Sequence, residues 1–510
     1  MKKETILYGT AVLILTNSAV KLMSLVYRGI MIRLIGPEGL GLTELMMPFY
    51  SFLIVIASLG IPLAISNFIS AENDEKKIQD IFHTGAVLLI LNGLAVTLLT
   101  FGLFPLFKDI IFSDSRVLPG FLVLIPTVFL ISAFSALRGF FQGSHLSSLI
   151  GKSQVTEQFT RMVAGILLVS LLLRSHCSLT VLIVGFSLAS FIAELFGGIY
   201  LLRKYRKSRI KRRGSFQKNL AKNMLRTGAP ITLSRIVISL TSAFQAVIIP
   251  RILISQGASI GDAATFYGLF AGVALTVLHL PSVVTGALTT PLMPAIAAAD
   301  GCGNHRLRNE RIGKSILFTN FTALPILALL FYYAEEICGL LFASPQAGYY
   351  LAFLSLGGIF LYLQQPIITI LQGMNRFSRL FLHYCTADFL YLAALILLGV
   401  YGSFSTERFM IIFIANDVLL FALNYLYLKR LTRFRISVLK TYFAPLLAVA
   451  AGFIVILPAE KYMMQTNITN LWSMILSAFL FFLLYFFTLY ISGALDKEFI
   501  SSLLSRQKRR

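Results

Sequence analysis

The chain has 510 residues, of which 57% are hydrophobic and only 13% are charged. So apolar a composition excludes an ordinary soluble protein and is typical of an integral membrane protein built from helices. The formal net charge of +22 does not indicate nucleic-acid binding, because the basic residues are concentrated in loops between apolar segments. The cysteines are far apart and form no CxxC pair, so neither a disulfide framework nor a metal site is predicted.

The first apolar segment, residues 6–35, is long enough to cross a bilayer, which takes about 20 helical residues. It nevertheless carries cations, and a charge at bilayer depth costs about 2.5–3.5 kcal/mol. Steps of four, three and four residues mark one face of an α-helix, so the segment should carry a polar stripe. The stripe consists of Asn17, Lys21, Ser24 and Arg28.

Two interpretations of this stripe are open. Lys21 and Arg28 could pair with carboxylates on neighbouring helices, or they could share one anionic ligand in a cavity. Two like charges on one face favour the shared ligand, because otherwise each needs its own buried partner. Arg33 lies off the stripe near the end of the segment, where its long side chain can reach the membrane interface.

About fourteen apolar segments have spanning length. The segment at 264–298 contains three prolines and should be the most bent. The fourteen segments cover residues 6–35, 43–70, 82–107, 118–140, 156–174, 179–202, 226–254, 264–298, 313–334, 348–372, 380–401, 407–428, 441–458 and 472–494.

The basic loops predict the orientation in the membrane. If the N-terminus is cytoplasmic and the segments alternate, nearly all Lys and Arg residues outside the spans fall on the inner side. This bias predicts an inner-membrane protein with both termini in the cytoplasm, whose basic loops contact anionic lipid. The outer side then receives only Lys108, Arg116, Arg174, Arg251, Arg408 and Lys461.

The segments form two similar sets of six. Gln-Gly occurs at the inner ends of the fourth and tenth segments, and GIPLAIS at 60–66 matches TPLMPAIA at 290–297 in position. Two like halves that both start inside predict a parallel repeat, which is a transporter plan with the substrate between the halves. We expect a six-helix lobe at 1–202, a basic cytoplasmic linker at 203–222, a second six-helix lobe at 223–430, and two extra helices with a basic tail at 431–510.

Further polar residues lie inside the spans. Arg235 in the seventh segment repeats the cationic face of the first, and the Glu157 and Arg161 side chains, four residues apart, should pair. Glu194 either faces inward or pairs with a basic loop. Buried oxygens of carboxylates and carboxamides can hold Na⁺ or carry a proton, although an acid here could instead neutralise Arg235. The candidates for this ion coupling are Asp388, Asn416 and Asp417.

No enzymatic motif is evident. The chain has no GxxxxGK[ST] nucleotide loop and no HExxH zinc motif, so we expect neither catalysis nor a cofactor. A cavity with a net positive charge selects anionic ligands, and phosphate or pyrophosphate would suit its Lys and Arg side chains. The last two spans add an apolar surface that either receives a hydrocarbon tail or simply packs in the bundle.

Three motifs carry a family resemblance: GIPLAISNFIS (60–70), SALRGFFQG (135–143) and SQVTEQFTRM (153–162). Together with PLMPAI in the eighth segment, they resemble the polysaccharide biosynthesis membrane proteins. That family lies in the superfamily of multidrug, oligosaccharidyl-lipid and polysaccharide exporters, beside the lipid II flippases.

The resemblance implies two six-helix lobes in a V around a central cavity. It also implies movement of an undecaprenyl-pyrophosphate-linked glycan to the outer leaflet. We expect the protein to act as a monomer. Lys21 and Arg28 match the first-helix cations that line the flippase cavity, Arg33 matches less well, and Asp388 matches an acid of their Na⁺ site. Sporulation members serve the spore cortex, which makes lipid II the leading cargo. Many relatives have an acid on the seventh helix where this chain has 243–245 (Ala-Phe-Gln), which argues against that Na⁺ site.

Three other functions compete with a flippase. A cation-coupled multidrug exporter predicts an acid-lined first lobe. A membrane scaffold that recruits cell-wall enzymes predicts no need for Lys21 or Arg28. A membrane glycosyltransferase predicts essential acids in loops, but the outer loops here are short.

Overall fold

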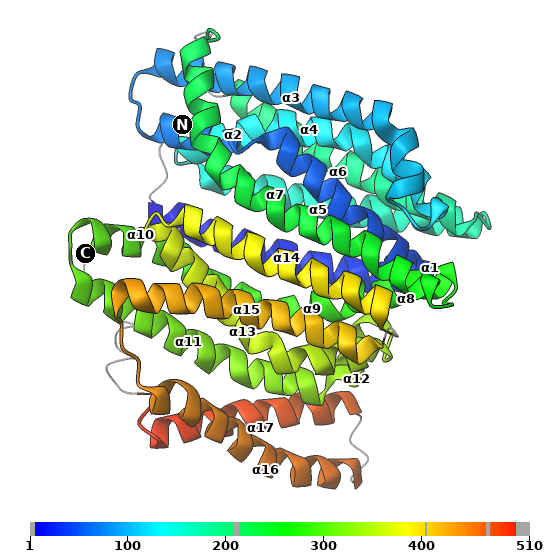
Figure 1. The fold of residues 1–510 in the computed structure, drawn as a ribbon, viewed down its shortest axis with the longest axis vertical. Coiled ribbons are helices and arrows are strands. Elements are labelled where there is room, and N and C mark those ends of the chain that lie inside the picture. The colour runs from blue at the N-terminus through cyan, green and yellow to red at the C-terminus, as the bar shows by residue number, and fades with distance from the viewer. Residues whose placement is uncertain (1–5, 208–213, 403–404, 466–469, 496–510) are drawn as a thin grey trace. The chain divides into compact units, whose positions relative to one another are not determined.

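The structure is a computed structural model that describes residues 6–207, 214–402, 405–465 and 470–495. Every element among these residues is a helix (Figure 1). The helices form two compact units, each with its own buried apolar clusters. Unit 1 comprises Met1–Thr276, Cys338–Ala347 and Phe377–Asn416, and unit 2 comprises Val277–Ile337, Gly348–Arg376 and Asp417–Arg510.

The helices have the following bounds. Unit 1 holds α1 (Ile6–Ser58), α2 (Ile61–Ser70), α3 (Glu75–Ile110), η1 (Ser115–Val117), α4 (Leu118–Gly143), α5 (Ser147–Arg174), α6 (Leu179–Lys207), α7 (Lys218–Ser255), α8 (Ile260–Tyr267), the π-helix η2 (Gly268–Ala274) and α14 (Phe377–Tyr401). Unit 2 holds α10 (Ser282–Gly301), α11 (His305–Tyr332), α13 (Ala347–Gly373) apart from its first residue, the π-helix η3 (Leu439–Phe443), α16 (Ala444–Gln465) and α17 (Asn470–Ile491). The residues of α9 (Leu275–His279), α12 (Ala334–Phe342) and α15 (Thr406–Thr432) are divided between the units.

The number of membrane crossings agrees with the sequence. Among the described residues, 13 helices are long and apolar enough to cross a membrane, with α1 counted once. The 53 residues of α1 would form a straight helix of about 80 Å, far longer than the ~30 Å core of a bilayer. The helix bends sharply at Gly36, whose φ of 73° is not helical, and therefore supplies two crossings. The prediction of an all-α membrane protein with about fourteen membrane helices is confirmed.

Two further spans are interrupted. The second crossing breaks between α1 and α2 at Leu59 and Gly60, which both have positive φ. A Cβ atom on Gly60 would lie 2.6 Å from the Gly228 carbonyl oxygen of α7, so only glycine allows this close approach. The predicted bend in 264–298 is also confirmed, because the helical run of α8, η2 and α9 ends before Pro281 and α10 begins at Ser282.

The last glycines of α4 and α13 make similar close contacts in the two halves of the chain. Gly143 is the last residue of α4, and a Cβ on it would meet the Ser66 oxygen at 2.7 Å and the Ile69 side chain. Gly373 is the last residue of α13, and a Cβ on it would meet the Met293 oxygen at 2.8 Å and the Ile296 side chain. The oxygen and the side chain are three residues apart in both cases. This likeness supports the predicted repeat, whose lobe boundaries remain a prediction.

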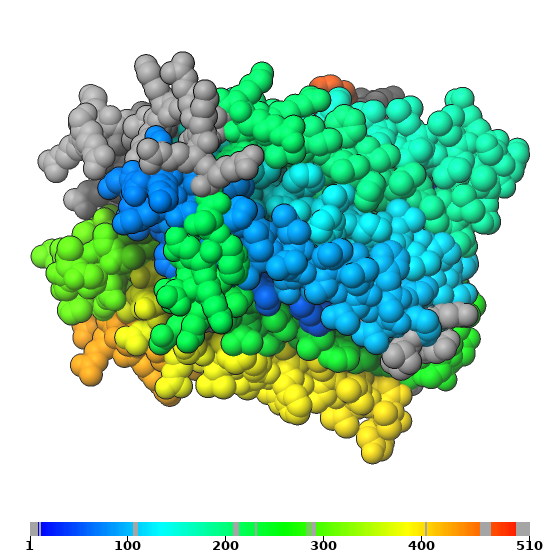
Figure 2. Space-filling model, turned by 90° about the horizontal axis from the view of Figure 1, so that it is seen from above, coloured from blue at the N-terminus to red at the C-terminus, as the bar shows by residue number. Residues whose placement is uncertain are grey.

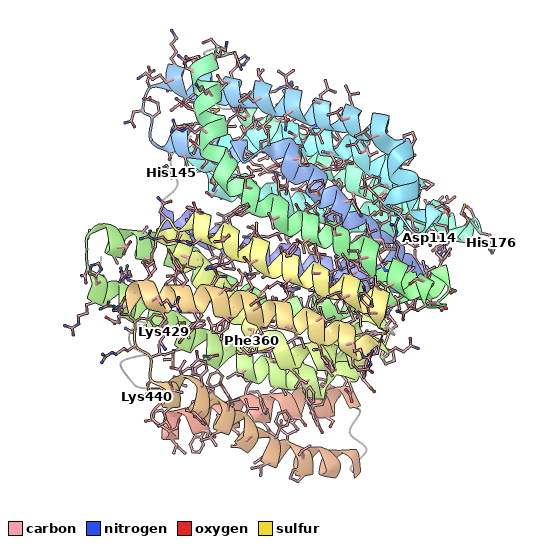
Figure 3. All side chains as sticks on the ribbon, in the orientation of Figure 1. Asp114, His145, His176, Phe360, Lys429 and Lys440 are labelled. Carbon is pink, nitrogen blue, oxygen red and sulfur yellow. The ribbon has the colours of Figure 1, made fainter. Side chains whose placement is uncertain are left out.

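The loops of unit 1 alternate between its ends. His145, between α4 and α5, lies at one end of these helices, and Asp114 and His176, in the loops on either side, lie at the other end (Figure 3). This alternation agrees with the predicted order of inner and outer loops. Which end faces the cytoplasm remains a prediction from the basic residues.

The segment before α7 is tied to α3. Asp80, which is 5% exposed, accepts hydrogen bonds from the Ser215 N–H at 2.7 Å, the Ser215 hydroxyl at 3.0 Å and the Gln217 amide at 2.9 Å. Figure 2 shows the beginning of α7 (green) against that of α3 (blue). The end of the predicted linker is therefore fixed, while its basic residues 208–213 lie outside the described residues.

Candidate functional site

The predicted polar stripe lies on the first half of α1. All four of its residues are helical, so their spacing places them on one face. Asn17 and Lys21 are exposed, and Ser24 and Arg28 are half-buried. The exposed part of the stripe is therefore its beginning, and protein surrounds its end.

Arg28 has a carboxylate partner. Its Nη1 lies 2.8 Å from Oε1 of Glu44, which belongs to the second half of α1. The same nitrogen donates to the Thr276 hydroxyl at 2.8 Å and to the Gly272 carbonyl at 3.3 Å. Gly272 belongs to the π-helix η2, and π-helical turns are frequent at functional sites. Of the two interpretations of the stripe, the structure therefore shows pairing with a carboxylate for Arg28.

Arg33 binds the end of a helix, and its predicted reach to the membrane interface remains a prediction. Its guanidinium donates to the Leu340 oxygen at 2.7 Å and the Leu341 oxygen at 3.2 Å. These are carbonyls in the last turn of α12, which lack partners within the helix. A Cβ on Gly29 would lie 2.5 Å from the Leu341 oxygen, so α12 passes closely over α1 here. This geometry gives Arg33 a capping role.

Arg235 and Asp388 do not neutralise each other. Among the described residues no ion pair joins them, and the Arg235 side chain is exposed on α7. Asp388 on α14 is only 8% exposed. It accepts a hydrogen bond from the Thr241 hydroxyl of α7 at 3.0 Å and is also hydrogen-bonded to the side chain of Asn416. The alternative in which Asp388 compensates Arg235 is therefore not seen.

Asp388, Thr241 and Asn416 form a small oxygen cluster within unit 1. Oδ1 of Asn416 is buried and has no hydrogen-bond partner among the described residues. Asp417, the next residue, is hydrogen-bonded to Gln364 within unit 2. Within the described chain, no group of three or more His, Cys, Asp or Glu side chains could hold a metal. A monovalent cation site here would use one carboxylate and neutral oxygens.

Four charged side chains form a network in unit 1. The predicted Glu157–Arg161 pair is confirmed, with Nη2 of Arg161 2.6 Å from Oε1 of Glu157. Nη2 of Arg138, on α4, lies 3.3 Å from Glu157 and 2.7 Å from Glu194. Glu194, on α6, is 2% exposed and so pairs with a neighbouring helix and not with a basic loop. The two arginines balance the two glutamates, so the network adds no net charge.

Sequence reasoning missed Glu44, Arg138 and Thr241, although each contacts a predicted residue. Their partners lie on other elements, and helical spacing along one segment carries no information about such contacts. The Gly36–Pro37 pair was the available signal for Glu44, because it predicts a turn that brings the two halves of α1 together. Arg138 lies within the motif at 135–143, but no spacing rule connects it to Glu194.

The buried cysteine of α12 is not a reactive thiol. Cys338, in α12, is buried, and burial raises the pKa of its thiol to about 12. A thiol with so high a pKa is protonated at neutral pH and is a poor nucleophile.

Sequence comparison identifies relatives. The profile of the polysaccharide biosynthesis protein family matches residues 6–299. Stage V sporulation protein B of Bacillus subtilis is 28% identical over 388 residues, which are 74% of either chain. The lipid II flippase MurJ of the same organism is 24% identical over 368 residues, 65% of this chain and 66% of its own. These matches confirm the resemblance that the motifs indicate.

Solved structures share the fold. One is the inward-facing form of a multidrug resistance transporter of the MATE family, in the MOP superfamily. It superposes on this chain with a TM-score of 0.68 at 15% sequence identity, and the match covers 81% of this chain and 94% of that one. Another is a MOP superfamily transporter from Pyrococcus furiosus, which is described as having a binding pocket of reverse polarity. It gives a TM-score of 0.62 at 15% sequence identity, and the match covers 84% of this chain and 95% of that one. At such identities the likeness shows the fold, which is that of a multi-pass membrane protein. Because the family profile matches more than half of its residues, the chain belongs to the polysaccharide biosynthesis protein family.

Proposed function

We propose that this protein is a flippase that moves an anionic lipid-linked glycan across the cytoplasmic membrane by alternating access. The position of Lys21 carries the proposal. Its side chain is exposed, and it lies midway along residues 6–35, the first predicted span. That depth is near the middle of a ~30 Å core. An ammonium exposed there should face water or an anion, because facing lipid would cost about 2.5–3.5 kcal/mol.

The chemistry of the stripe supports an oxyanion as the ligand. Lys21 supplies a point charge, and Arg28 lies about two helical turns further along the same face. All described contacts of Arg28 use its Nη1 atom, so its Nη2 and Nε atoms keep donors for a ligand. Glu44 holds the guanidinium in place. Phosphate and pyrophosphate match such a pair of cations.

The relatives' names support the class of cargo. Family members act in polysaccharide biosynthesis, and one curated relative is a lipid II flippase. An undecaprenyl-pyrophosphate-linked glycan combines the required anion with a membrane anchor. A lipid II-type peptidoglycan precursor is our leading cargo, with the spore cortex as its destination because of the similarity to a sporulation protein. The protein would work as a monomer with both termini in the cytoplasm.

The cluster at Asp388 supports coupling to an ion. The residues fit a small cation, since the Asp388 carboxylate, the Thr241 hydroxyl and the unpartnered Asn416 oxygen are hard oxygen ligands. On α7, the Thr241 hydroxyl lies two to four residues before positions 243–245, where the resemblance leads us to expect an acid. A carboxylate in this position could equally carry a proton. Na⁺ or H⁺ is the proposed coupling ion, and no other cofactor is proposed.

A multidrug exporter is the second candidate because the fold is shared with a MATE transporter. Such an exporter would need unpaired acids in the first lobe to hold cationic drugs. The acids deep in the spans of that lobe, Glu44, Glu157 and Glu194, each pair with an arginine. This observation favours the anionic cargo.

The test is translocation of fluorescent lipid II by the purified full-length protein in liposomes. Lys21→Ala should abolish flipping while the protein remains folded, and Lys21→Arg should retain part of it. Lys152→Ala, which removes an exposed lysine at the start of α5, is the matched control and should behave as wild type. Normal flipping by Lys21→Ala would refute the role of this cation. A wild-type protein that flips no lipid-linked glycan under either ion gradient would instead favour a scaffold for cell-wall enzymes.

A further inference from the structure

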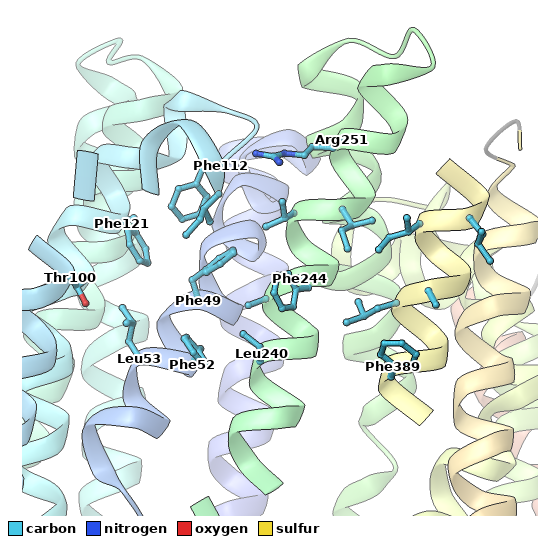
Figure 4. Close-up of a pocket in the computed structure, with 18 residues that line it drawn as sticks. Phe49, Phe52, Leu53, Thr100, Phe112, Phe121, Leu240, Phe244, Arg251 and Phe389 are labelled. Atoms are coloured by element: carbon cyan, nitrogen blue, oxygen red, sulfur yellow. The ribbon is translucent and has the colours of Figure 1, made fainter. Parts of the chain in front are cut away.

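A large apolar cavity lies within unit 1, apart from the polar stripe of α1. Its volume is about 920 Å³. One wall consists of residues from the second half of α1, α3 and α4, and the other consists of residues from α7 and α14 (Figure 4). The close-up shows phenylalanine rings on both walls, among them Phe49, Phe121, Phe244 and Phe389.

Only two of the 18 lining residues are polar. Thr100 is buried, and its hydroxyl donates to the Val96 carbonyl at 2.7 Å within its own helix, so it offers the cavity no unsatisfied group. Arg251 is exposed and lies at one end of the cavity, above Phe112 and Phe244 in the close-up (Figure 4). The cavity is thus apolar along its length and has an arginine at one end.

The length of the cavity matches one leaflet of a bilayer. On α7 the lining runs from Leu240 to Arg251, which is about 16 Å of helix. Half of a bilayer core of ~30 Å is about 15 Å. The predicted topology places Arg251 on the outer side, where the headgroup of an outer-leaflet lipid would lie.

The cavity also has exposed apolar side chains. Phe389 is 72% exposed, Leu397 56% and Phe244 45%, and all three belong to spanning helices. Large apolar side chains that are exposed at membrane depth face lipid. Water gains few hydrogen bonds in an apolar space, so lipid chains are the natural occupants.

We propose that this cavity binds one acyl chain of an anionic phospholipid whose headgroup is held by Arg251. The apolar walls recognise the chain, and the guanidinium recognises the phosphate. The site is distinct from the polar stripe around Lys21. The proposal does not depend on the identity of the cargo, because the ligand of this site is a resident membrane lipid.

Photocrosslinking tests the proposal with the full-length protein in nanodiscs. The probes are phosphatidylglycerol and phosphatidylcholine with a diazirine in one acyl chain, and the labelled peptides are mapped by mass spectrometry. Phosphatidylglycerol should label residues 240–248 and 389–397 more strongly than phosphatidylcholine does. Arg251→Gln should reduce this preference about fivefold, the effect of one basic residue near anionic lipid. Arg408→Gln, which removes another exposed arginine predicted on the outer side, should leave it unchanged.

A second variant tests the apolar part of the site. Ala393 lines the cavity, and Ala393→Phe should fill it and remove the labelling by both probes, as should Val247→Phe if the first variant does not fold. Ala450→Phe, at an exposed position on α16, should not alter labelling in unit 1. Equal labelling of the cavity and of α16 would overturn the proposal, as would a headgroup preference that survives Arg251→Gln.

Discussion

Nη1 of Arg28 and Oε1 of Glu44 are 2.8 Å apart, although the two residues belong to opposite halves of the bent helix α1. In a straight helix about 24 Å would separate their backbones. The ion pair therefore joins the first two membrane crossings across the bend at Gly36. It also orients a guanidinium that, through Thr276 and Gly272, contacts the helical run of α8, η2 and α9.

The Arg28–Glu44 pair should stabilise unit 1. Glu44→Ala should lower the free energy of unfolding by about 1–3 kcal/mol, because it leaves a partly buried guanidinium without its carboxylate. Arg28→Ala should cost a similar amount. The double variant should cost less than the sum, by about 0.5–3 kcal/mol, because the two residues are in contact. Thermal unfolding of the purified variants measures this coupling, and strictly additive losses would mean that the pair does not form.

The Asp388 cluster should make stability depend on the coupling ion. If Na⁺ binds the folded protein only, a concentration 100 times the dissociation constant adds about 2.7 kcal/mol. This stabilisation should disappear in Asp388→Asn and weaken in Thr241→Val. Asp262→Asn is the matched control, because that acid lies at the start of α8 and is hydrogen-bonded to Ser259. The measurement is the unfolding temperature in NaCl against choline chloride, and an undiminished Na⁺ effect in Asp388→Asn would exclude this site.

The helices and one of their breaks could be predicted from sequence because each is a local property. Apolar length marks the spans, and the prolines of 264–298 predict the break at Pro281, whereas the break at Gly60 was not predicted. The Glu157–Arg161 pair was equally accessible, since both residues lie on one helix at a spacing of four.

The partners of the site residues were not predictable in this way. Arg28, Glu194 and Asp388 each bind a residue on a different helix or on the far side of a bend. Such contacts depend on how the helices pack against one another. The periodicity of a single segment carries no information about this packing. The sequence therefore marked the charged positions inside the spans but did not reveal that Arg28 has a carboxylate partner.

The Arg138–Glu194 pair should matter more for stability than a surface pair. Because Glu194 is almost fully buried, Arg138→Ala should cost about 3–5 kcal/mol, the usual loss when one partner of a buried ion pair is removed. Replacing both partners, as in Arg138→Met with Glu194→Leu, should recover much of that loss. Lys314→Ala removes an exposed pair with Glu310 and should cost under about 0.5 kcal/mol. If thermal unfolding shows equal losses for Arg138→Ala and Lys314→Ala, the network is not buried as described.

The two terminal glycines, Gly143 and Gly373, should respond alike to substitution. An added methyl group would lie 2.7 Å and 2.8 Å from a carbonyl oxygen of the facing helix. Such overpacking costs about 1–3 kcal/mol, so both Gly→Ala variants should unfold at lower temperature. Gly102→Ala is the control, because nothing lies within 4 Å of a Cβ there, and alanine should stabilise that helix by about 0.5–1 kcal/mol. If only one of the two terminal glycines proves sensitive, the halves do not share this contact, and the predicted repeat loses its structural support.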